Sequence, residues 1–176
     1  MSELRTNRII PRDGLPSGSS GGIIQVKSVT KTDPFDTLST SYTDVTGLAV
    51  SITPTRADSK ILVTYHTNAA MEDIAHVGAL RLVRDSTPIF IGDANGSNSR
   101  NTGSLFLGTT SGMAPISSNF LDSPATTNAV TYQPAVCGNG ADSGVTIYVN
   151  RQGNSTGSGT SDDVQTSSIV LMEISA

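Results

Sequence analysis

The chain has 176 residues and a formal net charge of −4, which is the length of one domain with a further segment. An acidic chain with a pI near 4.9 lacks the basic face that binding to nucleic acid or to an anionic membrane requires. Only 15% of the residues are charged, whereas Ser, Thr, Gly, Val and Ile are abundant, a usage that favours strands and tight turns. No apolar run approaches the roughly 18 residues of a membrane span, and no apolar leader precedes a cleavage site. We therefore expect a soluble, all-β protein that is made in a cytoplasm, inserts into no membrane and binds no nucleic acid.

Residues 1–22 cannot form a core, because they hold few apolar side chains and are interrupted by Pro11, Pro16 and a Ser/Gly run. Such a segment is a linker, a disordered end or an arm that becomes ordered on a partner. We interpret residues 1–22 as an arm in which an apolar plug flanked by arginines docks on another protein, with residues 17–22 as the hinge. The expected particle-anchoring residues are Arg5, Arg8, Ile9, Ile10, Pro11, Arg12 and Leu15.

The first part of the domain reads as strands separated by turns. Residues 23–29 form the first predicted strand, and the Ser/Thr-rich connection 32–46 is expected to carry a short edge strand at 38–42. Apolar residues alternate with polar ones at 48–52 and again at 61–65, which predicts two half-buried strands. Because only a short turn separates these two runs, we expect them to pair as a hairpin.

The middle of the chain is expected to contain a second hairpin and a long loop. Residues 68–77 have mild helical character but are too short for a stable helix, so a loop or single turn is predicted. Residues 79–83 and 88–91 predict a hairpin in which their apolar side chains face one another. Residues 93–103 form a polar loop, and a loop of that length is either functional or mobile.

The last third continues the same pattern. A strand is predicted at 105–107, and the Gly- and Pro-rich stretch 109–127 is expected to turn three side chains inward. Residues 130–136 are predicted to be an edge or bulged strand, because Pro134 cannot donate to a central ladder. The three inward side chains of the preceding stretch are Ile116, Phe120 and Leu121.

Residues 139–144 have the composition of a turn, and residues 145–149 predict a strand. Residues 153–165 form a second long polar loop, and residues 169–174 predict an apolar final strand. About eight short strands without a credible helix predict an antiparallel β-sandwich of jelly-roll type over residues 23–176, with an extended N-terminal arm.

Two stretches resemble serine-hydrolase motifs. Gly18–Gly22 matches G-x-S-x-G, but a nucleophile elbow needs a preceding strand and a following helix, and neither is predicted. Asp142–Gly144 reads more simply as a hairpin turn, and only His66 and His76 are available as a base. We expect no catalytic residue.

Metal sites and reactive thiols are also not predicted. His66 is expected on a strand surface, and His76 follows Glu72–Asp73 without the third ligand that zinc needs. Asp93–Gly96 resembles a fragment of a calcium loop but lacks its other ligands. The single cysteine, Cys137, is expected to be a small buried or loop thiol. We predict no metal and no cofactor.

Four stretches resemble bacteriophage virion proteins, especially small tail-fibre and appendage proteins of cyanophages and other marine phages. The stretches are LRTNRIIPRDGLPSGSSGGIIQV at 4–26, SYTDVTGLAVSITPTRADSKILV at 41–63, LVRDSTPIFIGDANGS at 82–97 and SSIVLMEISA at 167–176. The resemblance implies a homotrimer in the virion, assembled in the host cytoplasm, whose arm binds other phage structural proteins and whose β domain points outward. The chain lacks a coiled-coil or β-helical shaft, which favours a short fibre or a capsid decoration protein.

Three functions remain open. The first is a non-enzymatic short tail fibre or appendage that meets the host surface, for example a glycan, with its two polar loops. The second is a capsid decoration protein whose arm threads between capsomers, and the third is a polysaccharide-degrading enzyme, although Asp162–Asp163 and Glu72–Asp73 are the only adjacent acidic pairs. A trimer would also cover the predicted edge strand and the apolar last strand. The expected receptor-facing residues are Asp93, Asn95, Ser97, Asn98, Arg100, Asn101, Arg151, Asn154, Ser155 and Asp162.

Overall fold

The structure is a computed structural model that describes residues 22–138, 145–155, 157 and 162–175. In this part of the chain the regular elements are all strands, and all strand pairs are antiparallel. The strands are β1 (Ile23–Lys31), β2 (Phe35–Thr37), β3 (Thr43–Asp44), β4 (Val50–Ile52), β5 (Lys60–Met71), β6 (Gly78–Arg84), β7 (Thr87–Ile89), β8 (Gly103–Leu105), β9 (Ala114–Asp122), β10 (Val130–Gly138), β11 (Ile147–Val149) and β12 (Ser167–Ile174).

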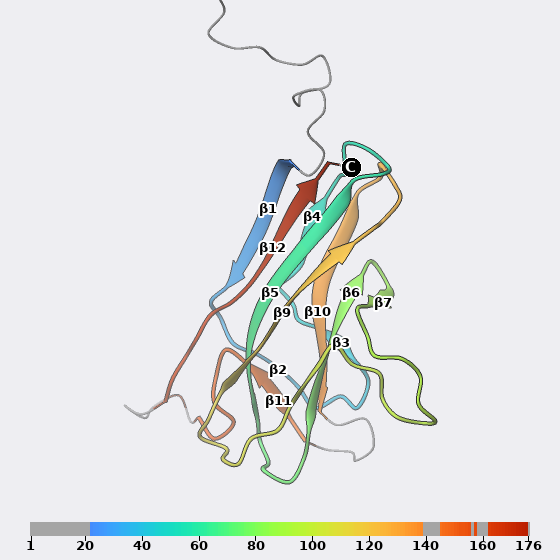
Figure 1. Cartoon of the computed structure of the whole chain (residues 1–176). Coiled ribbons are helices and arrows are strands. Elements are labelled where there is room, and N and C mark those ends of the chain that lie inside the picture. The colour runs from blue at the N-terminus through green and yellow to red at the C-terminus, as the bar shows by residue number, and fades with distance from the viewer. Residues whose placement is uncertain (1–21, 139–144, 156, 158–161, 176) are drawn as a thin grey trace, which may run out of the picture.

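The strands form two sheets that pack face to face (Figure 1). Sheet A has the order β1-β12-β5-β11-β2, with β9 on the other edge of β5. Sheet B has the order β3-β10-β6-β7, with β4 also paired to β10 and β8 also paired to β6.

The pairing order is that of a jelly roll. We count β3 and β4 as one interrupted strand along β10, and β7 and β8 as one interrupted strand along β6. The first strand then pairs with the last (β1 with β12), the second with the seventh (β4 with β10), the third with the sixth (β5 with β9) and the fourth with the fifth (β6 with β7). Because β12 also pairs with β5 and β10 with β6, the eight strands form two four-stranded sheets. The predicted fold class, an all-β antiparallel sandwich of jelly-roll type, is confirmed.

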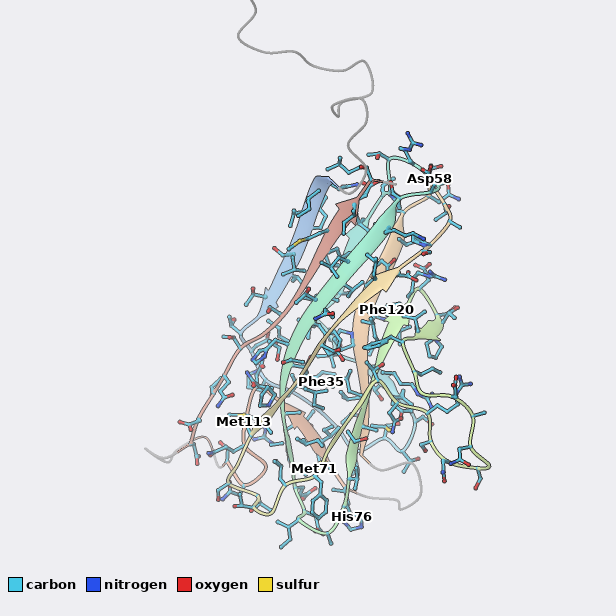
Figure 2. The ribbon with its side chains drawn as sticks, in the orientation of Figure 1. Phe35, Asp58, Met71, His76, Met113 and Phe120 are labelled. Atoms are coloured by element: carbon cyan, nitrogen blue, oxygen red, sulfur yellow. The ribbon has the colours of Figure 1, made fainter. Side chains whose placement is uncertain are left out.

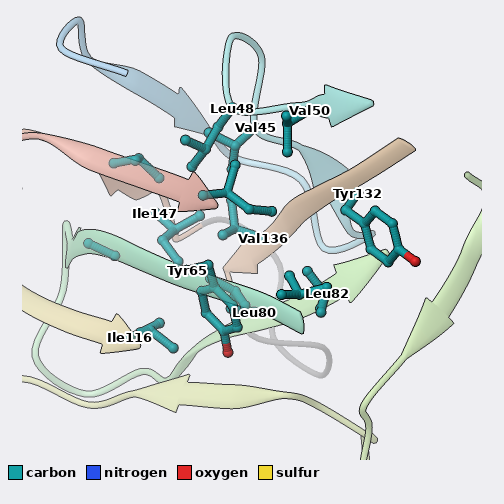
Figure 3. Packing of buried hydrophobic residues seen from close by; sticks show 14 of the residues in the cluster. Val45, Leu48, Val50, Tyr65, Leu80, Leu82, Ile116, Tyr132, Val136 and Ile147 are labelled. Atoms are coloured by element: carbon teal, nitrogen blue, oxygen red, sulfur yellow. The ribbon is translucent and has the colours of Figure 1, made fainter. Parts of the chain in front are cut away.

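The core lies between the two sheets (Figure 3). It is built from the inward-facing residues of the strands, which alternate with outward-facing residues along each strand. Burial of each large apolar side chain contributes about 1.5–3 kcal/mol to stability. The largest side chains that are almost fully buried include Leu48, Ile52, Ile61, Tyr65, Leu80, Leu82, Tyr132, Ile147, Ile169 and Leu171.

Several predicted elements are confirmed. The strand expected at 23–29 is β1, and the final strand expected at 169–174 is β12. The second hairpin is formed by β6 and β7, with Leu82 opposite Ile89. Strands were expected at 105–107 and 145–149, and β8 and β11 are short strands that overlap these ranges.

The hairpin expected between 48–52 and 61–65 is wrong. β4 pairs with β10 in sheet B, whereas β5 pairs with β12 and β9 in sheet A. The turn that follows Pro54 therefore carries the chain from one sheet to the other. Alternation showed which side chains are buried, but it holds no information about the partner strand.

The prediction that 130–136 is an edge or bulged strand is also wrong, because β10 lies in the middle of sheet B and its register with β6 is continuous. The carbonyl of Pro134 accepts a hydrogen bond from Val45 N (2.9 Å), so its nitrogen faces the same side, where the partner strand is interrupted between β3 and β4. The carbonyl of Val45 instead accepts a bond from Leu48 N (3.1 Å). A local turn thus removes the need for an N–H at position 134.

Three smaller expectations are corrected. The edge strand expected at 38–42 is absent, and strands β2 and β3 lie on either side of that range. Residues 68–71 belong to the end of β5 rather than to a loop. The stretch 109–127 contains the nine-residue strand β9, in which Ile116 is buried but Leu121 is 52% exposed. These two residues are five positions apart, and residues an odd number of positions apart face opposite sides of a strand.

The last strand needs no cover for its backbone, because β12 lies between β1 and β5. Since β10 is central as well, both strands have partners on each side within the chain. Unpaired strand edges, on which the expectation of a trimer rested, are therefore absent at β10 and β12. The arm, residues 1–22, lies outside the described residues except for Gly22.

Candidate functional site

The residues considered for catalysis do not form a reactive cluster in the described part of the chain. His66 is exposed, as expected, and its Nδ1 lies 2.8 Å from Ser117 Oγ. His76 Nδ1 lies 3.4 Å from Asp73 Oδ2. In the described ranges no three His, Cys, Asp or Glu residues are grouped as a metal site would require. The Asp142–Gly144 motif lies outside the described residues, and so does the G-x-S-x-G motif apart from Gly22.

Cys137 is completely buried on β10, which confirms its interpretation as a buried thiol. Burial raises the pKa of the Cys137 thiol, although contact with Tyr42 and the charge of Arg81 act in the opposite direction. A thiol held in its neutral form is a weak nucleophile. Within the described chain no helix is long and apolar enough to cross a membrane.

The point where the arm joins the domain is firmly attached. Ser175 N donates to the carbonyl of Gly22 (3.0 Å), which extends the ladder between β12 and β1 past the end of the strands. Gln25 Nε2 donates to the carbonyl of Thr53 (2.7 Å) and to Glu173 Oε2 (2.5 Å). The start of β1 is therefore bonded to the last strand and to the turn between the sheets.

Glu173 is the centre of this attachment. Its side chain is fully buried, and its Oε1 accepts hydrogen bonds from Thr55 N (2.7 Å) and Thr55 Oγ1 (2.8 Å). Burial alone would raise the pKa of Glu173, but the bonds from Gln25 and Thr55 outweigh burial and hold the pKa below its ordinary value. These hydrogen bonds thus hold the carboxylate in its charged form.

The first polar loop, 93–103, is held against sheet B at its C-terminal end. Arg81 Nε donates to the carbonyl of Arg100 (2.7 Å), and Arg100 Nε donates to the carbonyl of Gly92 (2.6 Å). The hydroxyl of Tyr42 donates to Asn101 Oδ1. The tip of the loop is exposed, with Asn98 N donating to the carbonyl of Asn95 (3.2 Å). The predicted residues of this loop that face solvent are Asp93, Asn95, Ser97, Asn98 and Arg100.

A pocket of about 290 Å³ opens on the outer face of sheet B beside this loop. The Arg81 guanidinium lies over the Tyr42 ring at 3.8 Å from its centre, which is the geometry of a cation–π contact. Burial and the nearby Cys137 raise the pKa of Tyr42 to about 12, so its hydroxyl keeps its proton. The remaining lining residues supply carboxylates, one hydroxyl and apolar side chains: Asp44, Val83, Asp85, Ser86, Pro88 and Ala135. These groups suit a small polar ligand that donates hydrogen bonds.

The second polar loop is described at 153–155, 157 and 162–165 and packs against a different part of the domain. The Arg151 guanidinium lies 4.2 Å from the centre of the Tyr148 ring, and Arg151 Nη1 donates to the carbonyl of Ser155 (3.3 Å). Ser155 Oγ donates to Asp162 Oδ2 (3.1 Å), and Asn154 Nδ2 donates to Ser111 Oγ (2.9 Å). Three of the predicted receptor-facing residues, Arg151, Ser155 and Asp162, are thus gathered in one cluster.

The two polar loops do not form one site. Loop 93–103 is bonded to Tyr42, which precedes β3, and to β6 of sheet B, whereas loop 153–165 is bonded to the connection between β8 and β9. Both lie in the half of the sandwich farther from Gly22, as Figure 1 shows. In Figure 2, Asp58 marks the end at which β1 begins and His76 marks the opposite end. The start of β1 and the two loops therefore lie in opposite halves of the domain.

Sequence reasoning missed the residues that hold these features in place. Tyr42, Arg81 and Glu173 were not singled out, and nothing in the chain order brings Tyr42 next to Arg81 until β3 and β6 are placed on either side of β10. The one signal was an arginine or glutamate within an otherwise apolar strand, as in LRLVR and IVLMEI. A charged residue in such a run is paired or hydrogen-bonded when it is buried.

The fold of the described residues is that of a jelly-roll β-sandwich. No protein-family model matches the chain, and no curated protein matches it. Among solved structures, a chain from the structure of the infectious bursal disease virus Gx strain is similar, with a TM-score of 0.40 and 13% sequence identity. The match covers 98% of the present chain and 43% of the viral chain, so the present chain spans less than half the length of that protein.

Proposed function

We propose that this protein is a non-enzymatic structural protein of a phage virion, a short tail fibre or appendage. Three copies associate as a homotrimer, whose arms, residues 1–22, bind other phage structural proteins and whose jelly-roll domains meet the host surface. The observation that carries the proposal is the polarity of the domain, in which β1 begins at one end and the two polar loops lie in the opposite half. The sequence resemblance to small virion proteins agrees with this arrangement.

The attachment at Gly22 supports an anchoring role for the arm. A tether transmits load only if its first ordered residues resist being pulled from the domain. Here a force on the arm is resisted by the hydrogen bonds between β1 and β12 and by the hydrogen bond from β1 to the buried Glu173. Strand β12 is in turn paired with β5 over seven residue positions, from Ser168 to Ile174. The arm is thus connected to the edge strand β1, which β12 joins to the long strand β5.

Loop 93–103 and the pocket beside it support a role in binding host glycans. Sugar hydroxyls donate hydrogen bonds, and the pocket presents the Asp44 and Asp85 carboxylates and the Ser86 hydroxyl. Loop 93–103 adds amide and guanidinium groups at its exposed tip. No metal or cofactor is part of the proposal.

Adsorption to host cells tests the tail-fibre function. The full chain, and variants in which 93–103 or 153–165 is replaced by a Gly/Ser segment of equal length, are compared on the strain that supports the phage. We expect wild-type protein to bind cells and to compete with phage adsorption, and the loop variants to bind at least roughly tenfold less, as loss of one or two key contacts predicts. Unchanged binding by both variants would contradict the role of the loops.

Labelling of purified particles separates the tail fibre from the alternative function of capsid decoration. With an antibody against the domain, label at the tail, in a handful or a few tens of copies, supports the proposal. Label over the head, in hundreds of copies, supports a decoration protein instead. Particles that carry no label would contradict both.

A further inference from the structure

An uninterrupted apolar row crosses the outer face of sheet A. The strand register places Val26 of β1 opposite Met172 of β12, Met172 opposite Leu62 of β5, and Leu62 opposite Leu121 of β9. Residues that are directly opposite in a sheet share a face, and the inward neighbour Leu171 identifies this face as the one turned away from the core. Val26 and Leu121, at the two ends of the row, are both 52% exposed.

The apolar area extends toward the end at which the arm joins. Ile23, which is 57% exposed, lies opposite Ile174, and Val170 lies on the other side of the row. Farther from the arm the same face becomes polar, with Thr64 opposite Asn119 and then a row that includes His66 and Ser117. The apolar patch is therefore confined to the part of sheet A nearest Gly22.

The patch has the character of an interface and not of a scattered surface. Monomeric proteins seldom expose a large contiguous apolar patch without a function for it. Four strands spaced by about 4.8 Å, and eight residues long, span a face of roughly 500 Å², and the apolar rows occupy about half of it. The strands β1, β12, β5 and β9 lie side by side across it (Figure 1).

Charge indicates what covers the face. The protein carries a net charge of −4, so two copies repel one another over most of their surfaces. On the outer face of these four strands the register places only two titratable residues, Lys60 and His66, and no carboxylate, because Glu173 and Asp122 point inward. This is a face on which two copies of an acidic chain approach each other without carboxylate repulsion.

We propose that the outer face of sheet A, centred on the row Val26–Met172–Leu62–Leu121, is the surface through which copies of this chain associate. The inference rests on the homotrimer that forms part of the proposed function, and it names the surface. The face of roughly 500 Å² is smaller than the roughly 800 Å² per partner of a standard interface, and in a closed ring of three each copy shares it between its two neighbours. Because the patch lies next to Gly22, association through it with all heads parallel gathers the three arms at one end.

The mass of the full chain in solution tests this assignment. Wild-type protein is expected to sediment as three copies of 18.2 kDa, about 55 kDa. Leu62→Glu and Met172→Glu each place a carboxylate in the centre of the row, where burial of an unpaired charge is strongly unfavourable, and are expected to raise the dissociation constant by roughly 100-fold or more. The matched control is Gln133→Glu, a half-buried outward position on the central strand of sheet B, which should leave the trimer intact.

The outcomes separate the two proposals. A monomeric wild-type protein would contradict self-association, and with it this part of the proposed function. A wild-type trimer that persists in both glutamate variants would contradict the surface assignment alone. If Gln133→Glu also abolished the trimer, an added carboxylate would dissociate the copies even when it lies outside the proposed face. This result would contradict the assignment as well.

A cross-linking experiment keeps the assignment testable if the glutamate variants do not fold. The double variant Val26→Cys/Leu121→Cys places exposed thiols at both ends of the row, and Cys137, being buried, does not compete. A bismaleimide shorter than the roughly 14 Å that separates the two positions within one copy can join only different copies. We expect dimers and trimers on a denaturing gel, and none for the control Ser51→Cys on sheet B. Equal cross-linking of variant and control would overturn the assignment.

Discussion

At the scale of single residues, Glu173 is the side chain on which the arm attachment depends. Its carboxylate accepts three hydrogen bonds, from Gln25 Nε2 and from the amide and hydroxyl of Thr55. Replacement of Glu173 by Gln turns one of the two carboxylate oxygens, which accept hydrogen bonds, into an amide NH2 group, which donates them. This group would then face the donors of the neighbouring residues. We expect a loss of about 1–3 kcal/mol in the free energy of unfolding at pH 7, measured by urea denaturation.

The same variant is expected to change the pH dependence of stability. Because the pKa of Glu173 lies below its ordinary value of 4.5 in the folded protein, the carboxylate stabilises the fold above pH 4.5 and loses this contribution as the pH falls through the folded pKa. The Gln variant should therefore lose less stability than wild type between pH 6 and about pH 3. Asp33, Asp58 and Asp73, whose pKa values are also lowered, remain in both proteins. Parallel acid titrations of the two proteins would contradict the assignment.

At the scale of elements, Pro134 shows how a proline is accommodated in a central strand. Its nitrogen faces the gap between β3 and β4, whereas the N–H of Ala135 faces β6, because successive residues of a strand alternate. Pro134→Ala should change the free energy of unfolding by less than about 1 kcal/mol, chiefly through the unfolded chain. Ala135→Pro should cost about 3 kcal/mol or more, because it removes a ladder donor in the middle of sheet B. Thermal unfolding of the two variants measures the contrast, and equal effects would contradict this explanation.

The elements that sequence reasoning predicted well are those whose alternation is local. β1, the β6–β7 hairpin and β12 need only period-2 patterns and a nearby turn. The fold class followed from the number of such runs and from the lack of helical periodicity. β9 was missed because its inward positions include Asp122 as well as Ile116, so its apolar signal is broken.

The remaining errors concern contacts between distant parts of the chain. β4 and β5 are adjacent in sequence and carry the expected pattern, but their partners are β10 and β12. The pocket beside loop 93–103 could not be predicted for the same reason, since Tyr42 and Arg81 meet only across β10. Buried polar residues such as Asn150, which donates to the carbonyls of Lys31 and Asp33, satisfy backbone groups whose positions the sequence does not state.

At the scale of the whole molecule, the jelly roll joins two sheets that carry different functions in our proposals. Sheet A holds the arm at one end and offers its outer face to further copies, whereas sheet B carries the pocket and loop 93–103. The sheets must move as one body if a load on the arm is to reach the loops. Their apolar core provides most of this coupling, and a buried polar cluster adds to it at the end of β9.

That cluster consists of Asp122 of sheet A with Arg84 and Tyr132 of sheet B. Asp122 Oδ2 accepts hydrogen bonds from Arg84 Nη1 and from the Tyr132 hydroxyl, both at 2.7 Å, and the side chain of Asp122 is 8% exposed. Burial, followed by the contact with Asp122, raises the pKa of Tyr132, so its hydroxyl remains a donor. Asp122→Ala leaves a partly buried guanidinium and a buried hydroxyl without their acceptor, and we expect a loss of about 3–5 kcal/mol in the free energy of unfolding.

The chain offers a matched control for this last prediction. Arg56 and Asp58 form an ion pair of nearly the same length, 2.8 Å, but both side chains are more than half exposed. Since solvent screens such a pair, Asp58→Ala should cost much less stability than Asp122→Ala. Urea denaturation of both variants at pH 7 measures the difference. If both variants lost the same small amount of stability, the two sheets would be held together by the apolar core alone, and the cluster would have no part in transmitting load from the arm to the loops.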